Sequence, residues 1–117
     1  MTPNDLDDYL RKLGYKVEVI IGDNGVEYSV IYDVTISHGS LKGKVCDVGL
    51  QRPTEIPYVL PAAIHTRPHL LPMDSSAPYA TQPGHIGSEW QYWSRRFERA
   101  PTPQNVWAHI KTVLGEV

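Results

Sequence analysis

The stretch VEYSVIYDVTI, residues 26–36, decides the fold of this chain. Its apolar residues alternate with polar ones, an order that only Ile31 breaks. Such alternation predicts a β-strand with one face buried and the other face in water.

Two further strands flank this one, each across a short polar turn. Residues 16–21 are rich in Val and Ile, and the turn 22–25 that follows has Gly, Asp and Asn, which tolerate positive φ. The turn 37–43 leads into a third strand over residues 44–50, and a fourth is expected over residues 58–66. Consecutive strands joined by short turns predict an antiparallel four-stranded meander.

A helix is predicted at each end of the chain. At the N-terminus Asn4 is the expected cap, Asp5, Asp7 and Asp8 lie in the acidic first turn, and Gly14 ends the helix. At the C-terminus Thr102 is the expected cap, Pro103 takes the first helical position and Gly115 closes the helix. Helices flanking an antiparallel sheet make the predicted fold class α+β.

The prolines set the middle of the chain apart. Nine of the ten lie between Pro53 and Pro103, and proline is excluded from helix interiors and central strands. A long ordered loop in a small domain is usually functional, so we expect any active site here. The chain has no repeat and no Gly/Ser linker, which predicts a single domain over residues 1–117.

Composition excludes several classes of function. A formal net charge of -2 gives no electrostatic footprint for nucleic acid. One cysteine excludes an internal disulfide and a multi-cysteine zinc site. No apolar run reaches the roughly 18 residues that a membrane span needs. We therefore expect a soluble, cytoplasmic protein with no membrane, nucleic-acid or cofactor partner.

The single thiol, Cys46, is in phase with Val48 and Leu50 on the third strand. Its side chain is predicted to face the core, where a cysteine behaves as a small, inert hydrophobe.

Histidines and serines gather in the proline-rich middle. The spacing of His65 and His69 is that of helical metal ligands, but Pro68 between them opposes a regular helix, so no metal site is predicted. A serine becomes a nucleophile only beside a base, and Ser88 lies three residues after His85. The alternative for Ser88 is an ordinary surface serine in a polar turn.

Aromatic and basic residues follow at once along the chain. Aromatic and arginine side chains together are the usual anchors of interfaces, which makes this segment a candidate partner-binding region. The alternative is a tryptophan core anchor beside a solvated arginine face. The candidate residues are Trp90, Tyr92, Trp93, Arg95 and Arg96.

Several motifs resemble those of E2 ubiquitin-conjugating enzymes. PTEIPYVLP (53–61) resembles the Tyr-Pro-x-x-Pro-Pro stretch of that family, and RPHL (67–70) resembles its His-Pro-Asn motif. APTP (100–103) resembles the entry into the family's crossover helix. EWQYWSR (89–95) and VWAHIK (106–111) resemble the bacterial proteins called prokaryotic E2 family E.

This resemblance implies a UBC-like fold with a long proline-rich active-site loop between the meander and the C-terminal helix. It also implies two protein partners, an E1-like activating enzyme and a ubiquitin-like protein. An ordinary E2 carries its thioester cysteine after the His-Pro-Asn motif, whereas residues 66–101 contain no cysteine. His69 stands where the motif has asparagine.

Two functions follow from the resemblance, and the sequence leaves open whether the protein is an enzyme. In the first, a loop serine accepts the ubiquitin-like C-terminus as an oxyester, with His85 or His69 as base. Ser88 is the first choice, and Ser75 or Ser76 the second. In the second, the chain is a non-catalytic E2 variant that binds and positions a partner. A small binding domain unrelated to conjugation is the remaining alternative.

Overall fold

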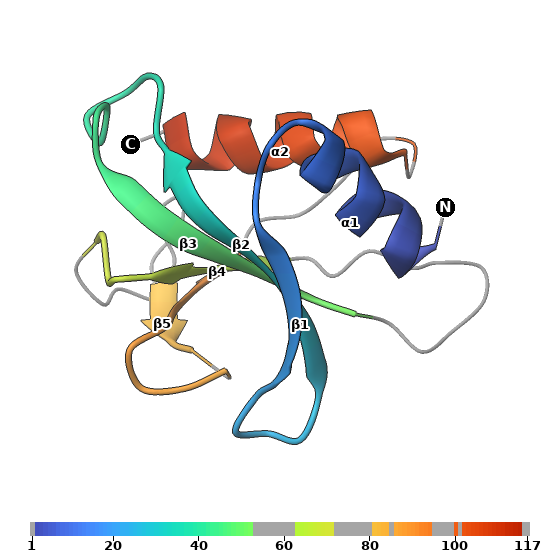
Figure 1. The fold of residues 1–117 in the computed structure, drawn as a ribbon. Coiled ribbons are helices and arrows are strands. Elements are labelled where there is room, and N and C mark those ends of the chain that lie inside the picture. Colours follow the sequence, from blue (N-terminus) through green and yellow to red (C-terminus); the bar gives the residue numbers. More distant parts are fainter. Residues whose placement is uncertain are drawn as a thin grey trace.

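The computed structural model describes residues 2–52, 63–71, 81–84, 86–94, 100 and 102–115. Figure 1 shows helices packed on a twisted sheet, the α+β arrangement expected. The elements, in chain order, are α1 (Pro3–Lys12), β1 (Val17–Ile21), β2 (Glu27–Thr35), β3 (Val45–Gln51), β4 (Ala63–Arg67), β5 (Thr81–Pro83), β6 (Gln91–Ser94) and α2 (Pro103–Gly115).

The strands form one antiparallel sheet in the order β1-β2-β3-β4-β6-β5. The predicted meander is confirmed for β1 to β4, which pair in sequence order. The predicted number of strands is wrong, because β6 pairs with β4 and β5 pairs with β6. These two strands are only four and three residues long, too short for alternation to reveal them. Residues 58–62 of the predicted fourth strand lie outside the described residues.

The cap of helix α1 lies two residues earlier than predicted. Thr2 is the cap: its hydroxyl accepts from the Asp5 N–H at 3.2 Å, while the Asp5 carboxylate accepts from the Thr2 N–H at 2.8 Å. This reciprocal pair is a capping box, which satisfies two helix-end donors at once. The prediction of Asn4 as cap is therefore wrong, and its side-chain oxygen accepts from Arg52 at 2.9 Å instead.

Both helices cover the same face of the sheet and lie side by side (Figure 1). Their apolar stripes pack on inward-facing strand residues to form the main core. Its buried members include Leu6 and Leu10 of α1, Val106, Ile110 and Val113 of α2, and Ile31, Val34, Cys46 and Val48 of the sheet.

Strand β2 changes face at a bulge. Asp33 has a φ of +56°, and the register with β3 shifts between Ile31 and Val34. Before the bulge Tyr28 and Val30 face away from the helices, whereas Ile31 and Val34 both join the main core. The prediction that one face of this strand is buried and the other lies in water is thus wrong, because both faces carry buried residues and the bulge inserts a residue that resets the phase.

A smaller core covers the opposite face of the sheet. Ile86 and Trp90 pack on Tyr28 and Val30 there. Gly49 of β3 makes this approach feasible, since an added Cβ would lie 2.5 Å from Ile86 Cδ1. The segment that carries Trp90 therefore packs directly on the sheet.

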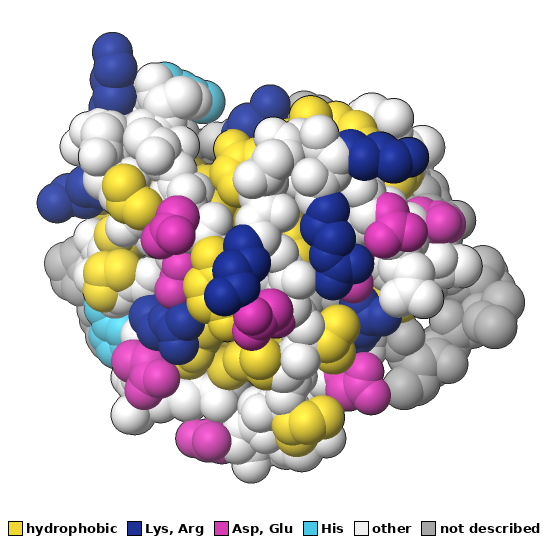
Figure 2. All heavy atoms as spheres, viewed as in Figure 1, with side chains coloured by type: hydrophobic (Ala, Val, Ile, Leu, Met, Phe, Trp, Pro, Cys, Tyr) yellow, Lys and Arg dark blue, Asp and Glu magenta, His cyan; other side chains and the backbone are white. Residues whose placement is uncertain are grey.

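Figure 2 shows side chains of both charge signs interspersed over the face seen in Figure 1, so the described residues form no extended basic patch on this face. Among the described residues, no helix is long and apolar enough to cross a membrane.

Candidate functional site

Cys46 lies in the main core, as its phase on the third strand predicted. Its side chain is 2% exposed. Burial, with a smaller effect from the charge of Asp47, raises the pKa of the Cys46 thiol to about 12. Because the thiolate is the reactive form, Cys46 is not placed to act as a nucleophile at neutral pH.

Ser88 occupies the tip of a tight turn. The Trp90 N–H donates to the Gly87 carbonyl at 3.1 Å, which closes a β-turn with Ser88 as its second residue. The Gly84 N–H donates to the Trp90 carbonyl at 2.9 Å and ties the turn to the end of β5. The Ser88 side chain is exposed, so its hydroxyl is open to a partner.

The side chain of His69 binds the backbone of this turn. Its Nε2 lies 3.1 Å from the Ser88 carbonyl oxygen and 3.0 Å from the Trp90 carbonyl oxygen. Both carbonyl oxygens only accept, so Nε2 is the donor in this contact. The contact joins His69 to the Ser88 backbone and not to its hydroxyl, so a role as base toward Ser88 stays a prediction.

Gln91 makes the reciprocal contact. Its buried side-chain oxygen accepts from the N–H groups of Leu70 and Leu71 at 3.0 and 3.1 Å, and its amide donates to the Leu71 carbonyl at 2.6 Å. Each of two segments, 69–71 and 88–91, thus holds the backbone of the other with one side chain. We call this arrangement the His69–Gln91 clasp.

Sequence reasoning missed Gln91. The sequence did contain a sign of its role. Gln91 is a polar residue between two tryptophans, and strand alternation places it on the same face as Trp93. Such a residue must find hydrogen-bond partners when it is buried. Which partners it finds depends on a contact twenty or more positions away, which spacing along the chain does not encode.

Arg67, the last residue of β4, also contacts the turn. Its Nε and Nη2 donate to one carboxylate oxygen of Asp47 at 3.1 and 2.9 Å. Its guanidinium carbon lies 4.5 Å from the Trp90 ring centroid, and Nη1 lies 3.6 Å from Glu89. Arg67 thus contacts Glu89 and Trp90, the two residues that follow Ser88 in the turn.

An open cavity of about 230 Å³ adjoins the clasp. The pairing of β3 with β4 ends where Asp47 faces Arg67, and Pro68 turns the chain away from the start of β3. Val45 is left 51% exposed at this opening. The lining residues are Lys44, Val45, Pro68, His69 and Leu70.

The candidate partner-binding tryptophans lie inside the protein. Trp90 is 1% exposed in the smaller core, and Trp93 is fully buried, with its indole N–H donating to Thr66 Oγ1 at 2.8 Å. Tyr92 is half-buried, with its ring 5.2 Å from that of His65. Both indoles thus serve the cores, and a partner contact through this segment stays a prediction.

The remaining candidates lie outside the described residues: His85, Ser75, Ser76, Arg95 and Arg96. His65 is buried between the rings of Tyr28 and Tyr92. In the part of the chain that the structure describes, no three His, Cys, Asp or Glu side chains gather as metal ligands would.

Comparison with known proteins returns one family. The family model described as "Prokaryotic E2 family E" matches residues 2–117. No curated protein and no solved structure matches the chain.

Proposed function

Because the chain belongs to prokaryotic E2 family E, we propose that it is the E2-like component of a bacterial ubiquitin-like conjugation pathway. In this proposal it acts in the cytoplasm, through a UBC-like fold with a proline-rich active-site loop. It accepts or positions a ubiquitin-like protein delivered by an E1-like enzyme. An unrelated small binding domain is disfavoured by a family match that spans residues 2–117.

The observation that carries the proposal is the His69–Gln91 clasp. It presses the segment that resembles the His-Pro-Asn motif against the turn that presents Ser88. A candidate acceptor therefore lies beside the position that the family uses for catalysis, although the family's cysteine is missing. Cys46, deep in the core, offers no substitute.

In the proposed reaction, the Ser88 oxygen attacks the carbonyl carbon of the ubiquitin-like C-terminus, held as a thioester on the E1-like enzyme. The C–S bond breaks, the E1 thiolate leaves, and the serine proton passes to a base. The products are a serine oxyester and a free E1 thiol. An alcohol is a poor nucleophile at neutral pH, so this step needs the base. The candidates for this base are His85 and His69.

One observation favours the second candidate function, a non-catalytic E2 variant that only positions its partner. The His69 nitrogen that reaches the turn is hydrogen-bonded to two backbone carbonyls, and the Ser88 hydroxyl is not its partner. A histidine held in this way stabilises the turn and does not activate the serine. In that case the protein binds the ubiquitin-like protein or the E1-like enzyme without forming a covalent bond.

The two functions are separated by incubating the chain with its E1-like enzyme, ATP and the ubiquitin-like protein. The acceptor role predicts an adduct that survives reducing agent and is lost in Ser88→Ala. Ser40→Ala is the matched control, because Ser40 is also an exposed serine in a turn. No adduct in the wild-type chain, together with binding of the ubiquitin-like protein, would favour the positioning role.

A further inference from the structure

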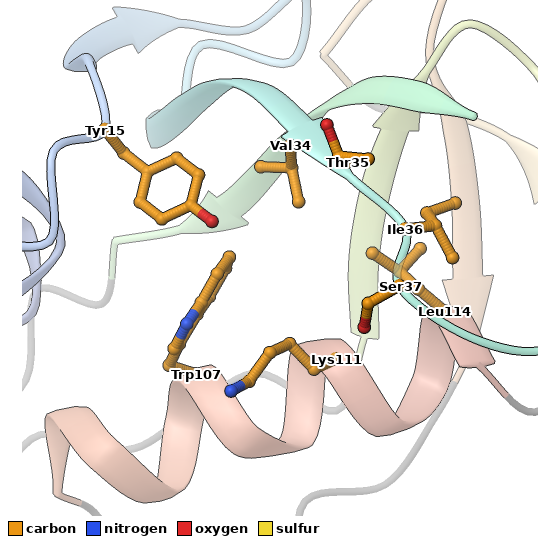
Figure 3. Close-up of a pocket in the computed structure, with 8 residues that line it drawn as sticks. All are labelled: Tyr15, Val34, Thr35, Ile36, Ser37, Trp107, Lys111 and Leu114. Carbon is orange, nitrogen blue, oxygen red and sulfur yellow. The ribbon is translucent and has the colours of Figure 1, made fainter. Parts of the chain in front are cut away.

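A second cavity lies on the helix side of the sheet, between α2 and the end of β2 (Figure 3). Its volume is about 130 Å³. It is distinct from the His69 cavity and shares no lining residue with it. The lining residues are Tyr15, Val34, Thr35, Ile36, Ser37, Trp107, Lys111 and Leu114.

The walls of this cavity are largely apolar. Val34, Ile36 and Leu114 belong to the main core and are buried. The rings of Tyr15 and Trp107 meet edge to face, with centroids 5.1 Å apart. Buried core side chains and a pair of aromatic rings therefore shape this cavity, and aromatic rings are common in the lining of ligand pockets.

Among the lining residues, the one charged side chain is that of Lys111. Lys111 is exposed, with its Nζ 5.8 Å from the Trp107 ring centroid. It forms no ion pair with any residue in the described ranges, and none of the lining residues is acidic. Figure 3 shows the Tyr15 hydroxyl pointing into the space between α2 and β2. A carboxylate at the mouth would therefore find a cation and a hydroxyl donor.

The size of the cavity limits what it can hold. Pockets for drug-sized ligands and cofactors measure about 300–1,000 Å³. An engineered apolar cavity of about 150 Å³ is filled by a molecule the size of benzene. At about 130 Å³, this cavity is close in size to the engineered one, and it fits one side chain.

We propose that this cavity is a peptide-recognition site. It takes one apolar side chain, leucine or phenylalanine in size, from a segment of another protein in which the next residue is Asp or Glu. The apolar side chain fills the space above the main core, and the carboxylate pairs with Lys111. The site acts independently of any chemistry at Ser88.

The proposed peptide site lies close to the His69 cavity. Thr35 pairs with Val45 across β2 and β3, and the Ile36 N–H donates to the Lys44 carbonyl at 2.9 Å. Lys44 and Val45 line the His69 cavity. A protein bound at Lys111 would therefore sit at the same end of the sheet as the candidate centre.

Capped peptides titrated against the full chain test the proposal by NMR, with the Trp107 indole N–H as reporter. Gly-Leu-Asp-Gly should shift this signal and the amides of Ser37 and Lys111. Gly-Leu-Asn-Gly should bind about 3- to 5-fold more weakly, the size of an exposed ion pair. Gly-Ser-Asp-Gly, which cannot fill the apolar space, should bind more weakly still.

Lys111→Gln should lower the affinity for Gly-Leu-Asp-Gly by the same factor and abolish the preference for Asp over Asn, and Lys111→Arg should restore both. Lys12→Gln is the control, since it removes the same charge from α1 outside the cavity. The proposal is overturned if no peptide shifts these signals, or if Lys111→Gln leaves the preference for Asp intact. Signals that move with protein concentration alone would also overturn it, by assigning the site to a second copy.

Discussion

Cys46 and Ser88 have opposite surroundings, and the surroundings decide which of them is available for chemistry. A thiolate is intrinsically the better nucleophile, but Cys46 is enclosed by the main core and its pKa is raised to about 12. Ser88 is a weaker nucleophile that stands exposed on an anchored turn. The inward position of Cys46 was predictable from its phase with Val48 and Leu50, because period-two alternation places such residues on one face.

The thiol should make stability fall at high pH. Burial raises the pKa of Cys46 from 9.0 to about 12, so the folded state keeps a proton that the unfolded chain loses. The stability that this thiol contributes is therefore complete below pH 9.0 and is lost as pH rises toward about 12, at up to about 1.4 kcal/mol per pH unit. Urea unfolding between pH 8 and 11 should show this extra loss in the wild type and not in Cys46→Ala. Parallel curves for the two proteins would refute the assignment.

Gln91 should hold the segment after His69 in place. Gln91→Leu removes three hydrogen bonds and leaves part-buried backbone groups of Leu70 and Leu71 without this partner, at a cost of about 2–3 kcal/mol. Hydrogen exchange should show faster exchange of these two amides in particular. Gln51→Leu, at an exposed position of β3, should leave them unchanged. If the Leu70 and Leu71 amides exchange as slowly in Gln91→Leu as in the wild type, Gln91 does not hold this segment.

At the scale of elements, the turn between β5 and β6 is the part that the sequence could not predict. The strands β1 to β3 could be predicted from the alternation of apolar and polar residues and from the Gly-containing turns between them. The turn 87–90 depends on contacts with distant partners, His69 and Arg67 among them. The motifs that resemble E2 proteins marked this region as functional, but they did not reveal how it is held.

Two glycines of this element should respond differently to the same substitution. A Cβ on Gly84 would lie 2.6 Å from the Trp90 carbonyl oxygen, a backbone atom that cannot easily move away. The nearest atom to a Cβ on Gly87 is 3.6 Å away, an ordinary contact. Gly84→Ala should therefore cost about 2–3 kcal/mol and displace the carbonyl that His69 binds, as overpacking does.

Thermal unfolding compares the two variants, and the His69 ring signals in NMR report on the clasp. Gly87→Ala should unfold within a few degrees of the wild type and keep those signals. Equal losses in both variants would show that the turn has no tight approach at Gly84.

At the scale of the whole molecule, a buried ion pair joins the N-terminal helix to the sheet. Asp7 of α1 pairs with Arg52 after β3, and their side chains are 2% and 14% exposed. Arg52 also donates to Ser29 at 2.8 Å and to Asn4 at 2.9 Å. The sequence placed Asp7 in an acidic first turn, where helix-dipole arguments apply. Its burial could not be predicted, because its partner lies 45 positions away.

Neutralising this pair should destabilise the fold far more than neutralising the acid next to it. Asp7→Asn leaves Arg52 without its buried counter-charge, which costs about 3–5 kcal/mol. Asp8→Asn breaks only an exposed pair with Arg11, worth at most about 1 kcal/mol. Chemical denaturation of both variants makes the comparison, and similar midpoints would contradict the role given to the Asp7–Arg52 pair.

The acceptor role that we propose for this chain predicts that it carries a ubiquitin-like protein as an oxyester. The most direct measurement is to map the attachment site in the wild-type protein by tandem mass spectrometry, after reaction with the E1-like enzyme, ATP and the ubiquitin-like protein. One half of the sample is treated with reducing agent after the reaction, and the other half is not. We predict a modified peptide that contains Ser88 and an ester that hydroxide cleaves. Attachment at Cys46 or at a lysine, or no covalent product at all, would contradict the account.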